Sequence, residues 1–323
     1  TVNPKPITVK ADAVSKSYGE TDPALTYEVE GLVNGDQMSG ELKRVEGENV
    51  GTYAIEQNTL TAGNNYTISY TGAELTINPK PVTADDVKLN GSLVYTGSEQ
   101  TQPITVTEGI TYEVSGNKAT EAGTYELTVK GTGNYTGEVT LSWSIKVADS
   151  VVETAPAANE LTYTGKDQDL VTAGTVIGGK LVYSLSEDGE YTETVPTGKN
   201  AGAYTVWYYI VGDANHADSA KAILEVEIAK AALTITSGNS TITYGDAPTA
   251  RGVIGSGFVN GESFADLDGR MTLSIDYEQY GDVGIYTITH GGWTSENYEI
   301  TYVSGTMTVN PKPITVKADA VSK

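Results

Sequence analysis

Few side chains in this sequence are of types that perform acid–base or nucleophilic chemistry. It contains two histidines, His216 and His290, and no cysteine. Histidine is the usual proton carrier near neutral pH, but both residues are predicted at comparable strand edges in different segments. No Gly-x-Ser-x-Gly elbow precedes a predicted helix, and the glycine-rich segments lie between predicted strands, where they form no phosphate cradle. We therefore expect no catalytic residues and no enzyme.

Aromatic side chains are the remaining candidates for ligand contact, because exposed tryptophan and tyrosine rings can stack on sugars or pack against proteins. Trp143 alternates with apolar neighbours and is predicted to be buried. Trp207 lies opposite Val206 in the alternation, so Trp207 and Tyr209 are predicted on an exposed strand face. Trp293 follows two glycines and is predicted in a loop. We predict Trp207, Tyr209 and Trp293 as ligand contacts, with a packing patch between modules as the alternative.

The charge balance restricts the partners. The chain has 42 acidic and 20 basic residues, a net charge of −22, which disfavours nucleic acid and anionic membrane surfaces. The acidic residues are scattered, as on a solvated surface. Calcium bound at module junctions is an alternative, but the nearest approach to a calcium loop, residues 266–269, is a poor match. We expect no cofactor. No apolar stretch has the length of a membrane span.

A recurring Gly-x-Tyr motif indicates the elements that position these residues. Each copy opens an alternating run typical of a strand, and a tyrosine there can bury its ring while its hydroxyl bonds nearby backbone, as in the tyrosine corner of immunoglobulin-type sandwiches. Where antibody domains have a cysteine two residues later, this chain has an aliphatic residue, so apolar packing is predicted to replace the disulfide. The four motifs are Gly51-Thr52-Tyr53, Gly123-Thr124-Tyr125, Gly202-Ala203-Tyr204 and Gly284-Ile285-Tyr286.

Four corners predict four small β-modules in tandem, an all-β fold of Ig-like sandwiches arranged as an elongated rod on the order of 120–160 Å. Short proline-bearing segments such as Asn78-Pro79-Lys80-Pro81 are predicted to stiffen the joins. The predicted boundaries are 1–5 for the end of a preceding repeat, 6–81 for module 1, 82–148 for module 2, 149–230 for module 3, 231–312 for module 4, and 313–323 for the first strand of the next unit.

The sequence also repeats on a larger scale. Residues 308–323 reproduce residues 1–16 letter for letter, an offset of 307 positions. Identity over such a length is not a chance event. We infer that a 307-residue unit of four unlike modules restarts near the end of this chain, which is expected to be an internal piece of a longer tandem array. The alternative is a chain cut so that it overlaps one boundary of the unit.

The motifs in modules 1 and 4 resemble the MBG (YGX-type) and YDG-like repeat domains of bacterial surface proteins. Modules 2 and 3 resemble related Ig-like repeats with Tyr-Thr-Gly, Ala-Gly-x-Tyr and Asn-Tyr motifs, although module 3 has His216 in the last tyrosine position. The resemblance implies an Ig-like stalk or adhesin region without a catalytic residue set. Its carriers are Tyr18-Gly19-Glu20, Gly31-Leu32-Val33-Asn34-Gly35-Asp36, Gly51-Thr52-Tyr53 and Tyr244-Gly245-Asp246.

We therefore expect a non-catalytic spacer from an extracellular, cell-surface or wall-anchored bacterial protein, with neighbouring repeats of the same chain as its partners. The chain is expected to be monomeric and to have no membrane insertion. The alternative is an adhesive module that binds a host glycan or protein through Trp207 and Tyr209. An isopeptide cross-link between Lys10 and Asn78 is a further candidate, testable by a mass deficit.

Overall fold

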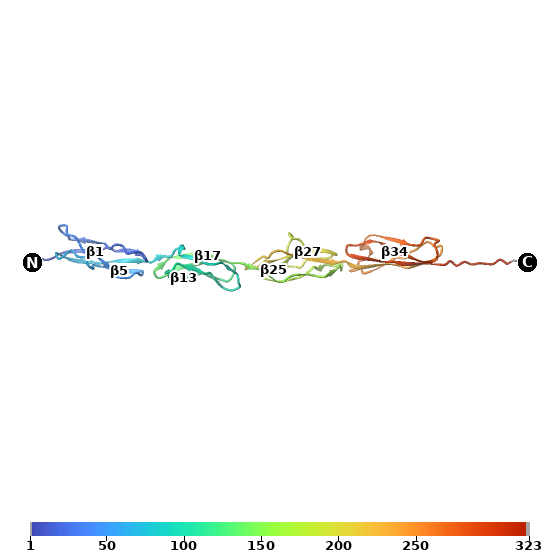
Figure 1. The fold of residues 1–323 in the computed structure, drawn as a ribbon, viewed down its shortest axis with the longest axis horizontal. Helices are drawn as coiled ribbons and strands as arrows, with labels where there is room; N and C mark the ends of the chain where they lie inside the picture. Colours follow the sequence, from blue (N-terminus) through green and yellow to red (C-terminus); the bar gives the residue numbers. More distant parts are fainter. Residues whose placement is uncertain (1, 321–323) are drawn as a thin grey trace. The chain divides into compact units, whose positions relative to one another are not determined.

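The computed structural model describes residues 2–320. Over that range the chain forms β-strands and two short 3-10 helices, with no α-helix, and no helix is long and apolar enough to cross a membrane. The chain divides into two compact units, Thr1–Ala148 and Asp149–Lys323. Unit 1 contains modules 1 and 2, drawn in blue and green in Figure 1, and unit 2 contains modules 3 and 4, drawn from yellow-green to red.

Module 1 is a sandwich of two sheets with strand orders β3-β1-β6 and β2-β7-β5-β4. The first stretch of the module serves both sheets, because β1 pairs in parallel with β6 and β2 pairs in parallel with β7. Alternate side chains of β1 are buried, as a strand with one face on a core requires. The strands are β1 (Lys5–Ala11), β2 (Val14–Ser17), β3 (Tyr27–Glu30), β4 (Lys43–Arg44), β5 (Gly51–Glu56), β6 (Tyr66–Thr71) and β7 (Ala73–Asn78).

Module 4 has the same topology, with sheet orders β32-β30-β35 and β31-β36-β34-β33. Its parallel pairs, β30 with β35 and β31 with β36, correspond to those of module 1. The elements are β30 (Ala231–Ser237), β31 (Ser240–Thr243), β32 (Val253–Ser256), η2 (Phe264–Asp266), β33 (Asp268–Ile275), β34 (Gly284–Thr294), β35 (Tyr298–Val303) and β36 (Gly305–Asn310).

Module 2 is built around the four-stranded sheet β10-β17-β15-β13, accompanied by shorter pairs of strands. Its elements are β8 (Lys80–Pro81), η1 (Ala84–Asp86), β9 (Val87–Leu89), β10 (Leu93–Val94), β11 (Gln100–Thr101), β12 (Ile104–Val106), β13 (Tyr112–Ser115), β14 (Lys118–Ala119), β15 (Gly123–Gly131), β16 (Tyr135–Thr136) and β17 (Glu138–Lys146).

Module 3 has a matching sheet, β21-β29-β27-β25. Its strands, preceded by β18 (Ala148–Asp149), are β19 (Val151–Thr154), β20 (Ala157–Ala158), β21 (Leu161–Thr162), β22 (Gln168–Asp169), β23 (Val171–Thr172), β24 (Thr175–Ile177), β25 (Gly179–Ser184), β26 (Thr197–Gly198), β27 (Gly202–Gly212), β28 (His216–Ala217) and β29 (Ala222–Ala229). The fold class predicted from sequence, all-β with tandem Ig-like sandwiches, is confirmed.

The four tyrosine corners form as predicted. Each tyrosine hydroxyl donates to the backbone carbonyl four residues earlier, at 2.7–2.8 Å. The residue two positions after each tyrosine is buried in the core, where an antibody domain would place its cysteine. The pairs are Tyr53 with Asn49, Tyr125 with Glu121, Tyr204 with Asn200 and Tyr286 with Asp282, and the buried residues are Ile55, Leu127, Val206 and Ile288.

A single residue separates the last strand of one module from the first strand of the next. Pro79 stands between β7 and β8, and Lys230 stands between β29 and β30. The segment predicted as a linker is thus partly in a sheet, because β8 pairs in parallel with β16 of module 2. After β36 comes Pro311, and residues 311–320 belong to no helix or strand; residues 321–323 of the predicted next strand lie outside the described part.

Candidate functional site: the module junctions

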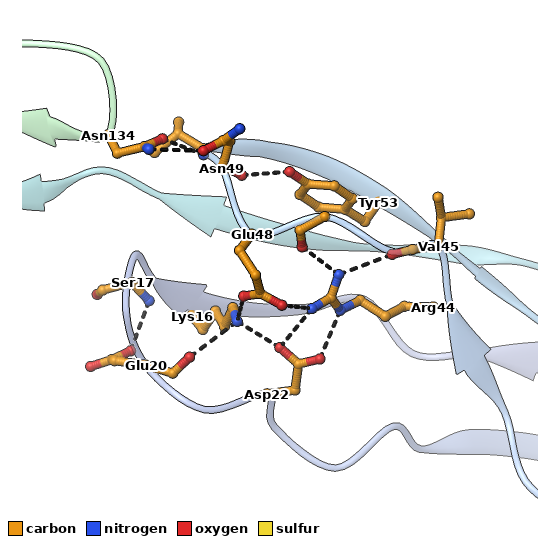
Figure 2. A network of polar contacts seen from close by, with 12 residues as sticks. Lys16, Ser17, Glu20, Asp22, Arg44, Val45, Glu48, Asn49, Tyr53 and Asn134 are labelled. Atoms are coloured by element: carbon orange, nitrogen blue, oxygen red, sulfur yellow. Dashed lines mark hydrogen bonds and ion pairs between the residues drawn. The ribbon is translucent and has the colours of Figure 1, made fainter.

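The junction inside unit 1 joins the corner loop of module 1 to an asparagine of module 2. Asn134 precedes β16 and uses its whole amide group. Its Oδ1 accepts from the backbone N–H of Val50 at 2.9 Å, and its Nδ2 donates to Oδ1 of Asn49 at 2.9 Å (Figure 2). Because Asn49 also supplies the carbonyl that Tyr53 binds, one short loop is held by its own module and by the next.

Aromatic packing accompanies this amide clamp. Tyr18 of module 1 meets Tyr135 of module 2 edge to face, with ring centroids 5.5 Å apart. Such a geometry adds about 0.5–1.5 kcal/mol beyond the buried area of the rings. The backbone N–H of Lys80 donates to the carbonyl of Asn134 at 3.0 Å, so the connecting chain enters module 2 in a fixed position.

The junction inside unit 2 repeats the same device with different residues. Asn297, which precedes β35 of module 4, accepts from the backbone N–H of Ala201 at 2.8 Å and reaches Oδ1 of Asn200 at 3.5 Å. Tyr163 of module 3 meets Tyr298 edge to face at 5.5 Å. In both units an Asn-Tyr pair therefore contacts the corner loop of the preceding module and the tyrosine of that module's Tyr-Gly or Tyr-Thr-Gly motif, here called its marker tyrosine (Tyr18 in module 1, Tyr163 in module 3).

Unit 2 adds a shared carboxylate. Glu262 accepts from the hydroxyls of Tyr163 and Tyr298, each at 2.6 Å, with one oxygen for each phenol. Burial, together with the nearby carboxylate, raises the pKa of both tyrosines to about 12. Asn260 further donates to the carbonyl of Gly165 at 2.9 Å. Buried side chains of modules 3 and 4 form one continuous apolar cluster around these contacts.

Below the corner of module 1 lies a compact charged cluster, defined by Lys16, Asp22, Arg44 and Glu48 (Figure 2). Lys16 is only 6% exposed, and its ammonium group contacts Asp22 and Glu48, each at 2.7 Å. Arg44 binds Asp22 at 2.7 Å, pairs with Glu48 and lies over the ring of Tyr53. Two cations and two anions thus alternate around one point, directly beside the Asn49 loop.

These contacts stabilise the ionised forms of all four groups. Hydrogen bonds from Arg44 and Lys16 lower the pKa of Asp22, and hydrogen bonds from Lys16 and Arg44 lower the pKa of Glu48. Hydrogen bonds to Asp22 and Glu48 raise the pKa of Lys16, and Asp22 raises that of Arg44. The buried ammonium group of Lys16 is compensated as buried charges must be.

Residues 7–76 and 233–308 each match the model of the MBG domain (YGX type). Each match covers most of one module, so modules 1 and 4 resemble MBG domains. The resemblance predicted from the Tyr-Gly and Gly-x-Tyr motifs is thereby confirmed. A search of curated protein sequences gave no match.

Solved structures that resemble this chain include arrays of Ig domains. Sidekick-1 immunoglobulin domains 1–5 share 12% identity, with 93% of this chain and 80% of that chain covered and a TM-score of 0.29. Titin domains I67–I69 share 12% identity over 70% of this chain and 99% of that chain, with a TM-score of 0.29. Three N-terminal domains of the bacteriophage RB49 outer capsid protein Hoc share 15% identity over 70% of this chain and 98% of that chain, with a TM-score of 0.24. These likenesses concern the fold alone.

The predicted ligand contacts of module 3 lie on β27, half-buried. Trp207 and Tyr209 are on the face opposite the buried Val206, as the alternation predicts. The ring of Tyr209 packs edge to face against Tyr191 at 4.9 Å, and Lys221 lies over the Tyr191 ring. The structure brings Trp207 and Tyr209 onto one face; their role as ligand contacts stays a prediction.

Trp293 lies elsewhere, in module 4, and the predicted loop position is wrong. It belongs to β34, because the two glycines before it continue the strand opposite β33. Its ring stacks on Phe264 with centroids 5.0 Å apart, and its backbone N–H donates to the hydroxyl of Tyr302. Trp293 thus packs against the core shared with module 3. Trp143 is buried in module 2, as predicted.

The histidines do not occupy comparable places. His216 opens β28 and its Nδ1 lies 2.7 Å from Asp213, whereas His290 is buried within β34 with Nδ1 2.8 Å from the hydroxyl of Ser237. Among the described residues, no group of three or more His, Asp or Glu side chains is arranged to hold a metal ion. Calcium at module junctions stays a prediction.

The cross-link candidates of module 1 lie in different sheets. Lys10 is exposed on β1, and Asn78 is exposed at the end of β7 in the other sheet. Isopeptide bonds require a lysine amine against the acceptor carbonyl, and this placement does not favour one.

Sequence reasoning missed the junction asparagines and the charged cluster. A signal for the first existed, because Asn precedes the tyrosine or histidine at the same place in all four modules. The second left a weaker signal: Lys16 lies on the same face of β2 as Val14, and Tyr18 continues the alternation just after the strand, so the pattern places a lysine among core residues.

Proposed function

We propose that this chain is a non-catalytic spacer from the extracellular region of a bacterial surface protein, and that it projects a distal domain away from the cell. The observation that carries the proposal is that the same kind of junction occurs twice. Between modules 1 and 2 and again between modules 3 and 4, an asparagine amide and a pair of tyrosine rings join consecutive modules. A spacer needs joints that resist bending, and directional hydrogen bonds together with ring packing supply that resistance. The MBG match of two modules supports the surface setting.

Small-angle X-ray scattering tests this function. Strands of about eight residues imply modules about 30–40 Å long, so a rod of four modules should have a maximum dimension of about 120–160 Å. The double variant Asn134→Ala with Asn297→Ala should broaden the distribution of interatomic distances without unfolding any module. A compact particle, or a distance distribution that both substitutions leave unchanged, would contradict the proposal.

A second function is direct adhesion through module 3. It is favoured by the half-buried face of β27, where Trp207 and Tyr209 lie beside the exposed Ile223. Such a face could take a glycan or a host protein by ring stacking. A glycan array with mucin and matrix proteins, with and without calcium, should then give a signal that Trp207→Ala removes. Tyr280→Ala, at an exposed tyrosine of module 4, is the matched control.

A further inference from the structure

The end of module 4 has the same two features that modules 1 and 3 use to contact the module that follows them, a corner loop and a marker tyrosine. Its corner loop has Asp282 and Val283 where the other two have Asn49-Val50 and Asn200-Ala201, and Val283 is 50% exposed. Its marker tyrosine, Tyr244, is 39% exposed, whereas Tyr163 at the equivalent place in module 3 is buried.

Module 1 begins with the complementary surface. Asn65 and Tyr66 form its Asn-Tyr pair at the start of β6, at the place of Asn297 and Tyr298 in module 4. The hydroxyl of Tyr66 donates to the carboxylate of Asp36 at 2.7 Å and accepts from the backbone N–H of Val33 at 3.3 Å.

The same arrangement in module 4 receives module 3. There, Tyr298 donates to Glu262 at 2.6 Å and accepts from the N–H of Val259 at 3.0 Å. Glu262 then binds the phenol of the preceding module with its second oxygen. Asp36 of module 1 therefore has the position and chemistry to do the same for a preceding tyrosine.

The connecting peptide is also the same. Asn78-Pro79-Lys80-Pro81, which links modules 1 and 2, recurs as Asn310-Pro311-Lys312-Pro313 after module 4 and as Asn3-Pro4-Lys5-Pro6 before module 1. Lys80 donates its backbone N–H to Asn134, and Lys5 donates to Asn65 at 2.8 Å in the same way. A chain that leaves module 4 through this peptide enters a following module 1 with Asn65 at the junction.

We propose that the far end of module 4 and the near end of module 1 are two halves of one junction, and that the partner at this surface is the next copy of the 307-residue unit. Asn65 of the following copy accepts from the N–H of Val283 and donates to the carboxylate of Asp282. Tyr66 packs on Tyr244, whose hydroxyl donates to Asp36. Aspartate suits the corner because it retains the acceptor oxygen that asparagine supplies elsewhere. The inference holds whether or not the array serves as a spacer.

The test extends the full chain by one further copy of residues 17–81, which continues the repeat in register through a second module 1. Hydrogen exchange is then measured at the Val283 amide in the natural and the extended chain. Burial of that N–H in a hydrogen bond to Asn65 of the added copy should slow its exchange about tenfold or more. Unchanged exchange would overturn the proposal.

The two copies of module 1 provide a matched control. Asn65→Ala in the added copy should return the Val283 amide to its original exchange rate, whereas Asn65→Ala in the first copy should leave it slow. Because both variants carry the same substitution in the same module, the first-copy variant also reports whether module 1 still folds. Equal effects of the two variants, or none from either, would contradict the assigned junction.

Discussion

Modules 1 and 4 have the same topology and strand register, but charged side chains pack beneath the tyrosine corner of module 1 and apolar side chains pack beneath that of module 4. Lys16 pairs across the sheet with Ile77, and the equivalent pair in module 4 is Ile242 with Val309. Arg44 pairs with Ile55, and the matching residue beside Ile288 is Ile275. Two cations of module 1 are thus two isoleucines in module 4.

The rest of the charged cluster is replaced as well. Glu48 corresponds to Gly281, by its distance from the corner tyrosine, and the ring of Tyr277 packs edge to face on Tyr286 where Arg44 lies over Tyr53. Tyr277 is buried beside Gly281 in a second apolar cluster. The corner and the alternating strands therefore define the fold, whereas the side chains packed beneath the corner can be ionic or apolar.

The largest expected effect tests the shared framework. Ile55→Ala and Ile288→Ala each remove a fully buried side chain from the same corner position, so each should lower the free energy of unfolding of its module by about 2–5 kcal/mol. Exchange protection resolved by module, or calorimetry, measures this loss. Ile254→Ala, at a residue 71% exposed, is the control and should change little. A large loss of unfolding free energy in only one of the two modules would show that Ile55 and Ile288 do not have equivalent structural roles.

Alkali should loosen the joint between modules 3 and 4. The pKa values of Tyr163 and Tyr298 are raised to about 12 in the folded state, above the ordinary value near 10. A raised pKa means that stability is present below pH 10 and is lost as the pH rises from about 10 to 12. The loss is about 2–3 kcal/mol for each tyrosine and less than additive, since both share Glu262. Ultraviolet titration should show Tyr163→Phe removing one late-titrating phenol; ordinary titration of all tyrosines would contradict this.

Acid should act on module 1 and spare the corner of module 4. The pKa values of Asp22 and Glu48 are lowered by Lys16 and Arg44, so their contribution is present above the unfolded values near 4 and is lost as the pH falls below them. Exchange protection at the corner of module 1 should fall as the pH drops below about 4, more than at Ile288 of module 4. Equal losses would show that the charged cluster contributes nothing specific.

Replacing the charged cluster of module 1 with apolar residues should preserve stability only when all four charged side chains are replaced together. Lys16→Ile alone leaves two carboxylates facing Arg44 and should destabilise module 1 clearly. The quadruple variant Lys16→Ile, Asp22→Ala, Arg44→Ile and Glu48→Gly should unfold within a few degrees of the natural protein and lose the acid sensitivity, because a buried ion cluster and an apolar filling are often of similar stability. A quadruple variant less stable than the single one would contradict the comparison.

The smallest effect concerns Tyr277. Its hydroxyl is buried, and no hydrogen-bond partner for it exists among the described residues. Removal of an unsatisfied polar atom relieves a desolvation cost, so Tyr277→Phe should leave module 4 unchanged or stabilise it by up to about 1 kcal/mol. Thermal melting monitored through Trp293 measures this. Tyr286→Phe, which removes a satisfied hydroxyl, should instead destabilise the module.

Local patterns in the sequence determined the fold class and the corners. Period-two alternation specifies which side of a strand is buried, and Gly-x-Tyr specifies where a strand begins, so the residues two positions after the corner tyrosines could be assigned to the core from the sequence alone. These residues are Ile55, Leu127, Val206 and Ile288. The placement of Trp207 and Tyr209 on the face of β27 opposite Val206 followed from the same rule, whereas the half-burial of both side chains did not. All of these features depend on residues close together in the chain.

The tertiary structure alone decided the contacts between distant segments. Asn134 meets Asn49 across 85 positions and Glu262 meets Tyr163 across 99, and no local pattern specifies such pairs. The alternation gave only a weak signal that Lys16 is buried, and the structure supplied its partners Asp22, Arg44 and Glu48, because burial of a charge depends on groups that folding brings together. The strand position of Trp293 likewise depended on pairing with β33, which alternation could not reveal through two glycines.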